Sequence, residues 1–269
     1  MVKIKSSFFF VILSTGLLSC SGSSPSPNTT VGVSNSDSSG FAGDALTRSL
    51  KEHLFDPVVA RSISLENEAL NGQCRNETDK TPSDLIHSFY SGKPFRNYSE
   101  PFPGFRRFEF PDSEALKEAK DLRICDEVIT LSASGECTGD KKNVCDSAVA
   151  HDWHHWIPMG WPYTDAPLVM KALNVIYEAR LNGNSICIHC WAGKHRTGMV
   201  SLLAEAANLE TLDEASLDEI YERYRRHTWF SECQYVGEIK EAVKFLIETP
   251  EFLSFRKKWQ DHIGHLETP

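Results

Sequence analysis

Between residues 112 and 250, hydrophobic and polar positions follow two alternating patterns. Three short β-rich runs are apolar enough to be strands covered on both faces: 126–133, 154–159 and 185–189. Apolar residues at helical spacing precede, separate and follow these runs, in stretches that begin near residues 113, 167, 197, 217 and 236. This order predicts an α/β fold with a central, mostly parallel twisted sheet flanked by helices.

The first 42 residues show neither pattern. Residues 1–19 join a basic start to an apolar run too short to cross a membrane, which is typical of an export signal. The run ends in "LLSC", which resembles a bacterial lipoprotein processing site, so Cys20 is expected to become the lipidated first residue. An ordinary secretory signal is the alternative. Residues 20–42, rich in Ser, Gly, Pro and Asn, predict a flexible tether, and residues 43–269 predict one domain.

These features predict an exported protein that a lipid anchor alone holds at a membrane, facing the periplasm or the cell exterior. The formal net charge is −9, and removal of residues 1–19 with Lys3 and Lys5 brings it to −11 (−9 − 2). A charge of this sign argues against a nucleic-acid-binding protein, although it allows a local positive pocket. We expect a monomer.

The chain has eight cysteines, and seven remain if Cys20 carries lipid. An odd number means that at least one is not in a stable disulfide. Exported proteins can carry disulfides, and the best local pair is Cys137 with Cys145, at the two ends of a polar loop.

The stretch "SICIHCWAGKHRTGMV" places Cys190 where a predicted strand ends and Arg196 where a helix begins. Ligands bind at this end of the strands in open α/β sheets. Gly193 permits a tight curl whose backbone amides could wrap an oxyanion, and Gly198 lets the helix pack closely. Arg196 could grip two oxygens of that anion, and a Cys190 thiolate would face its central atom. The Thr197 hydroxyl could hydrogen-bond the sulfur.

The segment "HCWAGKHRTG" resembles the signature of the cysteine-dependent protein tyrosine and dual-specificity phosphatases, and the resemblance extends over residues 85–250. It implies a tyrosine-phosphatase-like fold and hydrolysis through a phosphocysteine, with no metal and no cofactor. His189 would stiffen the loop. The residues implied to bind phosphate are Trp191, Ala192, Gly193, Lys194, His195 and Arg196.

The resemblance also implies a general acid on a loop one strand and one helix upstream of the cysteine. Asp165 in "WPYTDAP" has that place, although its position before Pro167 equally suits a helix cap. Asp152 is the reserve candidate. In the tyrosine phosphatase branch a late glutamine often positions the hydrolytic water, and Gln234 has the matching order.

The sequence indicates the substrate less directly than it indicates the reaction. Lys194 resembles the loop lysine of inositol-lipid phosphatases, but Trp191 stands where those enzymes commonly have a second lysine. We therefore expect a phosphotyrosine or dual-specificity phosphatase that acts on a phosphorylated protein. An enzyme for a small phosphorylated ligand such as an inositol phosphate is the alternative.

Three other hypotheses compete. "CIHC" could be a redox pair, which would require Cys187 and Cys190 to form a reversible disulfide. The chain could also bind phosphate without turning it over. "HDWHHW" could suggest a metal site, but it leads into a predicted strand, where histidines three and four apart do not share a face.

Overall fold

The computed structural model describes residues 39–71, 83–160, 165–228 and 235–264, all of which belong to one compact unit. The lipidation site Cys20 and the proposed water-positioning Gln234 lie outside the described residues. The first helix, α1, spans Ser39–Phe55 and so begins within the segment predicted to be a tether. The folded unit thus starts a few residues before the expected boundary at residue 43.

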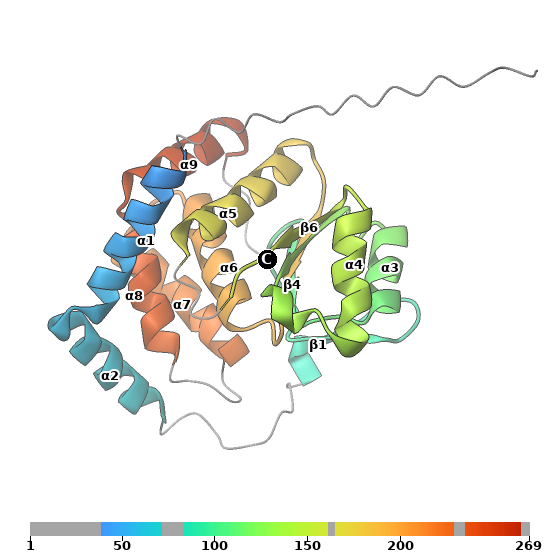
Figure 1. The fold of residues 1–269 in the computed structure, drawn as a ribbon, viewed down its shortest axis with the longest axis horizontal. Helices are drawn as coiled ribbons and strands as arrows, with labels where there is room; N and C mark the ends of the chain where they lie inside the picture. Colours follow the sequence, from blue (N-terminus) through green and yellow to red (C-terminus); the bar gives the residue numbers. More distant parts are fainter. Residues whose placement is uncertain (1–38, 72–82, 161–164, 229–234, 265–269) are drawn as a thin grey trace, which may run out of the picture. The chain divides into compact units, whose positions relative to one another are not determined.

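A five-stranded sheet lies at the centre of the unit, in the order β3-β4-β7-β5-β6 (Figure 1). The strands are β3 (Ser99–Phe102), β4 (Phe105–Phe108), β5 (Glu127–Leu131), β6 (His154–Ile157) and β7 (Ile186–His189). All neighbours pair in parallel except β3 and β4, which are antiparallel. The predicted α/β fold with a mostly parallel sheet is therefore confirmed.

The N-terminal third holds elements that the patterns did not predict. Besides α1, β3 and β4, these are α2 (Pro57–Asn71), the turn η1 (Ser83–Leu85), and the antiparallel pair β1 (Ile86–Ser88) and β2 (Pro94–Arg96). Helix α1 packs on α5 and α8, while α2 packs on α8. Downstream, the predicted loop between Cys137 and Cys145 contains the turn η3 (Gly139–Lys141) and the start of α4 (Lys142–Ala150).

Helices cover both faces of the sheet (Figure 1). One face packs against α5 (Ala166–Leu181) and α6 (His195–Asn208), and further out lie α7 (Glu214–Thr228), α8 (Val236–Ile247) and α9 (Pro250–His262). The other face packs against α3 (Ser113–Asp121) and α4. Strand β7 alternates accordingly: Ile186 and Ile188 belong to the first core, and Cys187 belongs to the second.

Helix α6 is the central helix of the unit. Every one of its residues is buried, which requires neighbours on all sides. It begins directly after the loop that follows β7, the central strand, so a side chain on its first turn stands on a rigid support. The fold therefore fixes both ends of the loop from Cys190 to Arg196.

Two disulfides brace the described part of the chain. Cys137 and Cys145 are joined, as predicted, and Cys125 is joined to Cys187 on β7. The second bond links β7 to the segment before β5. Within the described residues, no helix has the length and apolar character needed to cross a membrane.

Candidate active site

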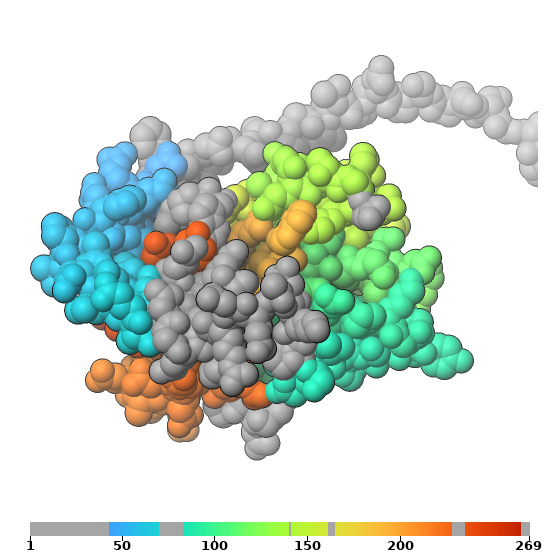
Figure 2. Space-filling model, turned by 90° about the horizontal axis from the view of Figure 1, so that it is seen from below, coloured from blue at the N-terminus to red at the C-terminus, as the bar shows by residue number. Residues whose placement is uncertain are grey.

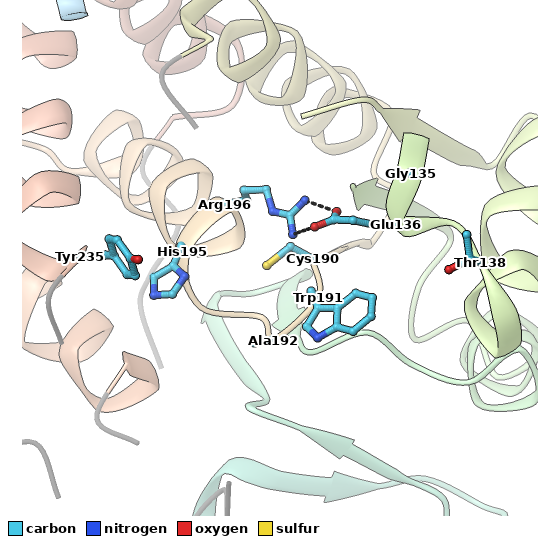
Figure 3. A pocket seen from close by; sticks show the side chains of 9 residues that line it. All are labelled: Gly135, Glu136, Thr138, Cys190, Trp191, Ala192, His195, Arg196 and Tyr235. Atoms are coloured by element: carbon cyan, nitrogen blue, oxygen red, sulfur yellow. Dashed lines mark hydrogen bonds and ion pairs between the residues drawn. The ribbon is translucent and has the colours of Figure 1, made fainter. Parts of the chain in front are cut away.

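A cavity of about 570 Å³ opens at the carboxyl end of β7. It is lined by Gly135, Glu136, Thr138, Cys190, Trp191, Ala192, His195, Arg196 and Tyr235 (Figure 3). Its two main walls are the loop after β7 and the segment after β5. In the space-filling view, chain from around residue 190 reaches the surface beside the green part of the molecule (Figure 2).

Cys190 is the nucleophile candidate of this cavity. It is the only free cysteine among the described residues, and only 2 % of its surface is exposed. Cys187 is bonded to Cys125 and cannot form a disulfide with Cys190 in this structure. The redox interpretation of "CIHC" is therefore wrong for this fold, because Cys187 points to the opposite face of β7 from the cavity.

The loop after Cys190 is tight at Gly193, where φ is +64°. A Cβ on this glycine would lie 2.5 Å from the backbone carbonyl of Phe108 and 2.6 Å from the backbone nitrogen of Glu109. Only glycine fits such a contact at a positive φ. At Gly198, a Cβ would lie 2.1 Å from the Tyr224 ring, so this glycine does let α6 pack closely, as predicted.

Side chains from the neighbouring strands hold the loop from behind. Arg107 on β4 is almost fully buried, and its Nη2 donates to the carbonyl of Gly193 at 2.5 Å. The Asn97 amide donates to the carbonyl of Ala192 at 2.9 Å. With these loop carbonyls held from behind, the loop is pre-formed. Neither residue was among the predicted site residues; the available signal for Arg107 was a charged residue between two phenylalanines of a strand, in "FRRF".

Arg196 stands over Cys190 in the first turn of α6 and is paired with Glu136 (Figure 3). Its Nη1 donates to Glu136 Oε2 at 2.5 Å and to the carbonyl of Met159 at 3.0 Å, and its Nη2 donates to Glu136 Oε1 at 3.0 Å. These bonds use three of the five guanidinium N–H groups. The Nε–H and the second Nη2–H lie together on the remaining edge, which suits a two-oxygen grip on an anion.

The charges of this pair reinforce each other. Burial alone would lower the pKa of Arg196, but the hydrogen bonds that Arg196 donates to Glu136 and the nearby Cys190 outweigh it and raise that pKa. Burial alone would raise the pKa of Glu136, but the bonds and charge of Arg196 outweigh it and lower that pKa. Both groups are therefore ionised near neutral pH. Glu136 was not among the predicted site residues, because nothing in its local sequence pattern points to Arg196, 60 residues away.

His189, which was predicted to stiffen the loop, belongs to a buried network at the end of β7. Its Nε2 lies 2.8 Å from the Thr130 hydroxyl, which also lies 2.7 Å from His154 Nε2. Burial lowers the pKa of His154 to about 4 and that of His189 well below its usual value. Both rings are therefore neutral near pH 7, so they can fix the strand end without adding charge.

The other predicted site residues lie in different places. Trp191, half exposed, lines the cavity with Ala192 and His195, whereas Gly193 and Lys194 do not. Burial raises the pKa of Glu109, and the charge of Lys194 opposes that rise only in part. The buried Thr197 hydroxyl has no hydrogen-bond partner among the described residues.

Asp165 is the N-cap of α5, where its Oδ1 accepts from the backbone nitrogen of Leu168 at 3.2 Å. It lines a separate hollow with Gly43 and Lys171, not the cavity of Cys190. The reserve candidate Asp152 is exposed and does not line that cavity either. The carboxylate that the described structure brings into the cavity is Glu136.

The histidines of "HDWHHW" have other partners. His154 and His155 lie on β6, where His155 bonds Glu127 at 2.9 Å and His154 bonds Thr130. Within the described ranges, no group of three His, Cys, Asp or Glu side chains is placed to hold a metal ion. The expectation of chemistry without a metal stays a prediction.

No protein-family model matches the sequence, and no curated protein matches it. Among solved structures, two catalytic cores of Siw14 are similar. One, described as a PP-IP phosphatase from S. cerevisiae in complex with citrate, is 20 % identical with a TM-score of 0.40, and the match covers 59 % of this chain and 94 % of that one. The other is 19 % identical with a TM-score of 0.46, and the match covers 64 % of this chain and 95 % of that one.

A third similar structure is a mutant form of Tk-PTP, which is 17 % identical with a TM-score of 0.37 over 62 % of this chain and 95 % of that one. All three likenesses lie at or below 20 % identity and below a TM-score of 0.5. The assignment of a function therefore depends on this chain's own cavity and the residues that line it.

Proposed function

We propose that the protein is a phosphomonoester hydrolase of the cysteine-dependent protein tyrosine and dual-specificity phosphatase superfamily. The observation that carries the proposal is the placement of a free, buried Cys190 between a strand end and the Arg196-bearing first turn of α6. All other described cysteines are in disulfides, so Cys190 is the one described free thiol, and it lines the cavity. A site that only binds phosphate needs Arg196 but has no use for this thiol.

In the first step, the Cys190 thiolate attacks phosphorus, and the bond from phosphorus to the ester oxygen breaks. The electron pair leaves with that oxygen, and a phosphocysteine forms. Water then attacks the phosphocysteine, and the thiolate leaves. The N-terminus of α6 and the edge of Arg196 that does not bind Glu136 stabilise the charge on the equatorial oxygens in both steps.

The leaving oxygen needs a proton when its alcohol is weakly acidic. Asp165 is the candidate that the order of elements indicates. Glu136 lines the cavity, but its lowered pKa keeps it ionised near neutral pH, so its role there is to fix the orientation of Arg196 through two hydrogen bonds.

Phosphotyrosine is the substrate that the lining supports best, with a dual-specificity enzyme as the broader form. Trp191, His195 and Tyr235 give the cavity aromatic walls that suit a phenyl ring. Inositol phosphates are the second candidate, because Lys194 and Lys141 both add positive charge close to the loop.

The decisive test is phosphate release by the purified protein from three substrates offered in parallel. These are a phosphotyrosine peptide, a phosphoserine peptide and an inositol phosphate. We expect turnover of the phosphotyrosine peptide, complete loss of turnover in Cys190→Ser, and retained binding of that peptide by the same variant. A reduced, folded wild-type protein that releases phosphate from none of the three would instead indicate a binding module.

We further propose that the enzyme works outside the cytoplasm, anchored through lipid on Cys20. Two disulfides within the domain are consistent with an oxidising compartment. Metabolic labelling with a radioactive fatty acid should mark the wild-type protein and not Cys20→Ser. Equal labelling of both proteins would rule out this anchor.

A further inference from the structure

Lys141 is a cation beside the Cys190 cavity that the attack on a single phosphate does not require. It ends the turn η3, within the loop that the Cys137–Cys145 disulfide closes. Its Nζ contacts the ring of Trp191 and lies 5.1 Å from the centre of the Phe110 ring. Because Trp191 lines the cavity directly after Cys190, Lys141 borders the cavity over this indole.

The ammonium of Lys141 forms no salt bridge with any residue in the described ranges, whereas neighbouring Lys142 pairs with Asp146. Burial lowers the pKa of Lys141 to about 8, and Arg196 contributes to the fall, while Glu136, Glu109 and Cys190 oppose it. Besides these four groups, His189 lies within reach of the Lys141 charge, which adds to the lowering of the His189 pKa by burial. A partly desolvated cation without a salt bridge is stabilised when an anion binds beside it.

Both Lys141 and Trp191 are held in place by the surrounding structure. The disulfide fixes the loop of Lys141 to the start of α4, and the carbonyl of Trp191 accepts from the backbone nitrogen of Phe110 at 3.2 Å. The Lys141 ammonium is thus held in a defined position beside the loop of residues 190–196, although Lys141 is not part of that loop. Arg196 and the start of α6 already serve the phosphate that reacts, so a second anionic group is left for Lys141.

We propose that Lys141 and Trp191 form a second anion subsite, and that the substrate carries a further anionic group beside the phosphate that Cys190 attacks. The inference rests on the proposed phosphatase function and narrows its substrate class. A phosphotyrosine next to an acidic residue and a multiply phosphorylated small molecule share this chemistry.

The test compares 4-ethylphenyl phosphate with 4-(sulfomethyl)phenyl phosphate, whose sulfonate stays ionised at all relevant pH values. The measured quantity is the ratio of kcat/KM for the sulfonate to kcat/KM for the ethyl compound. The Lys141→Met variant keeps the unbranched stem and removes the charge. We expect it to lower the ratio by about tenfold, a size typical of one charge pair in a partly buried site. Lys141→Arg should retain most of the ratio.

Lys142→Met is the matched control, because it removes the adjacent lysine, which is exposed and paired with Asp146. It should leave the ratio unchanged. In the wild type the ratio should also fall as the pH rises through about 8, where Lys141 loses its proton, and it should stay flat in Lys141→Met. The phosphate and Cys190 are common to both substrates, so their titration cancels in the ratio.

The outcomes separate the two proposals. If the wild type releases phosphate from neither compound and from none of the earlier substrates, the phosphatase function itself is wrong. If it hydrolyses both compounds and Lys141→Met changes the two kcat/KM values by the same factor, the phosphatase stands and the second subsite is wrong. The Arg variant also tests whether charge, rather than the shape of the lysine, sets the preference.

Discussion

The loop that carries Cys190 and the segment that carries Glu136 meet at one cavity, but they are built in different ways. The first runs over seven residues from the central strand into the buried helix α6, and Arg107 and Asn97 hold its carbonyls from behind. The second, residues 132–141, contains several exposed residues and is fixed by a disulfide and by the bonds of Glu136. Residues 190–196 are therefore held through their backbone, whereas residues 132–141 are held by a disulfide and by side-chain hydrogen bonds.

This difference teaches which parts of an active site can tolerate change. A loop held by its backbone contacts can adopt only one conformation. One added atom in its path therefore displaces every group that the loop presents. A segment fixed by side-chain bonds can lose one bond and keep its course. Substitutions should therefore lower activity more in residues 190–196 than in residues 132–141. They should lower it least at residues that do not line the cavity.

Gly193→Ala should have the largest effect. The added Cβ would press on the backbone of Phe108 and Glu109 at a positive φ, so the loop must move. Displacement of reacting groups by about 1 Å can cost about a hundredfold, and we expect at least that loss in kcat/KM. The measurement is hydrolysis of 4-nitrophenyl phosphate at matched concentrations of folded protein.

Gly183→Ala is the control for backbone strain. Gly183 has a φ of +73° after α5, but a Cβ there would meet no atom within 4 Å. It should lower the free energy of unfolding by about 1 kcal/mol and leave kcat/KM unchanged. Equal losses of activity in both variants would mean that instability, and not the path of the loop, explains the Gly193 result.

The same contrast explains what the sequence could and could not predict. The strand, the turn glycine, Cys190 and Arg196 are neighbours in sequence, so their pattern predicts both the local structure and its chemistry. Asn97, Arg107 and Glu136 reach the loop from 60 residues away or more, and their local patterns name no partner. Strands β3 and β4 do not follow from the local pattern because "SEPFPGFRRF" is short and rich in proline and charge, and β3 lies at the edge of the sheet.

Glu136→Gln should have an intermediate effect. The glutamine can accept from only one of the two Arg196 nitrogens, and the buried guanidinium loses its counter-charge. We expect about a tenfold lower kcat/KM for 4-nitrophenyl phosphate, whose leaving group needs no proton, because the orientation of Arg196 is weakened. Glu222→Gln, which removes an exposed carboxylate paired with Arg225, should change nothing. An equal loss in the two variants would contradict a specific role for Glu136.

Asp165 should show the smallest effect, because it lines another hollow and caps α5. Asparagine is an equally good cap, so Asp165→Asn should keep both stability and turnover, whereas Asp165→Ala should lose about 1 kcal/mol of stability. The two substrates that decide are phenyl phosphate, which needs a proton on its leaving oxygen, and 4-nitrophenyl phosphate, which does not.

We expect Asp165→Asn to keep kcat/KM for both substrates within about threefold, which is far less than the hundredfold or more that loss of a general acid costs. A large loss with phenyl phosphate alone would instead establish Asp165 as the acid predicted from the order of elements. In that case α5 would have to present its cap to the cavity during turnover. If Glu136→Gln shows the loss that is selective for phenyl phosphate, the carboxylate that orients Arg196 also supplies the proton, and the cross-linked segment performs both tasks.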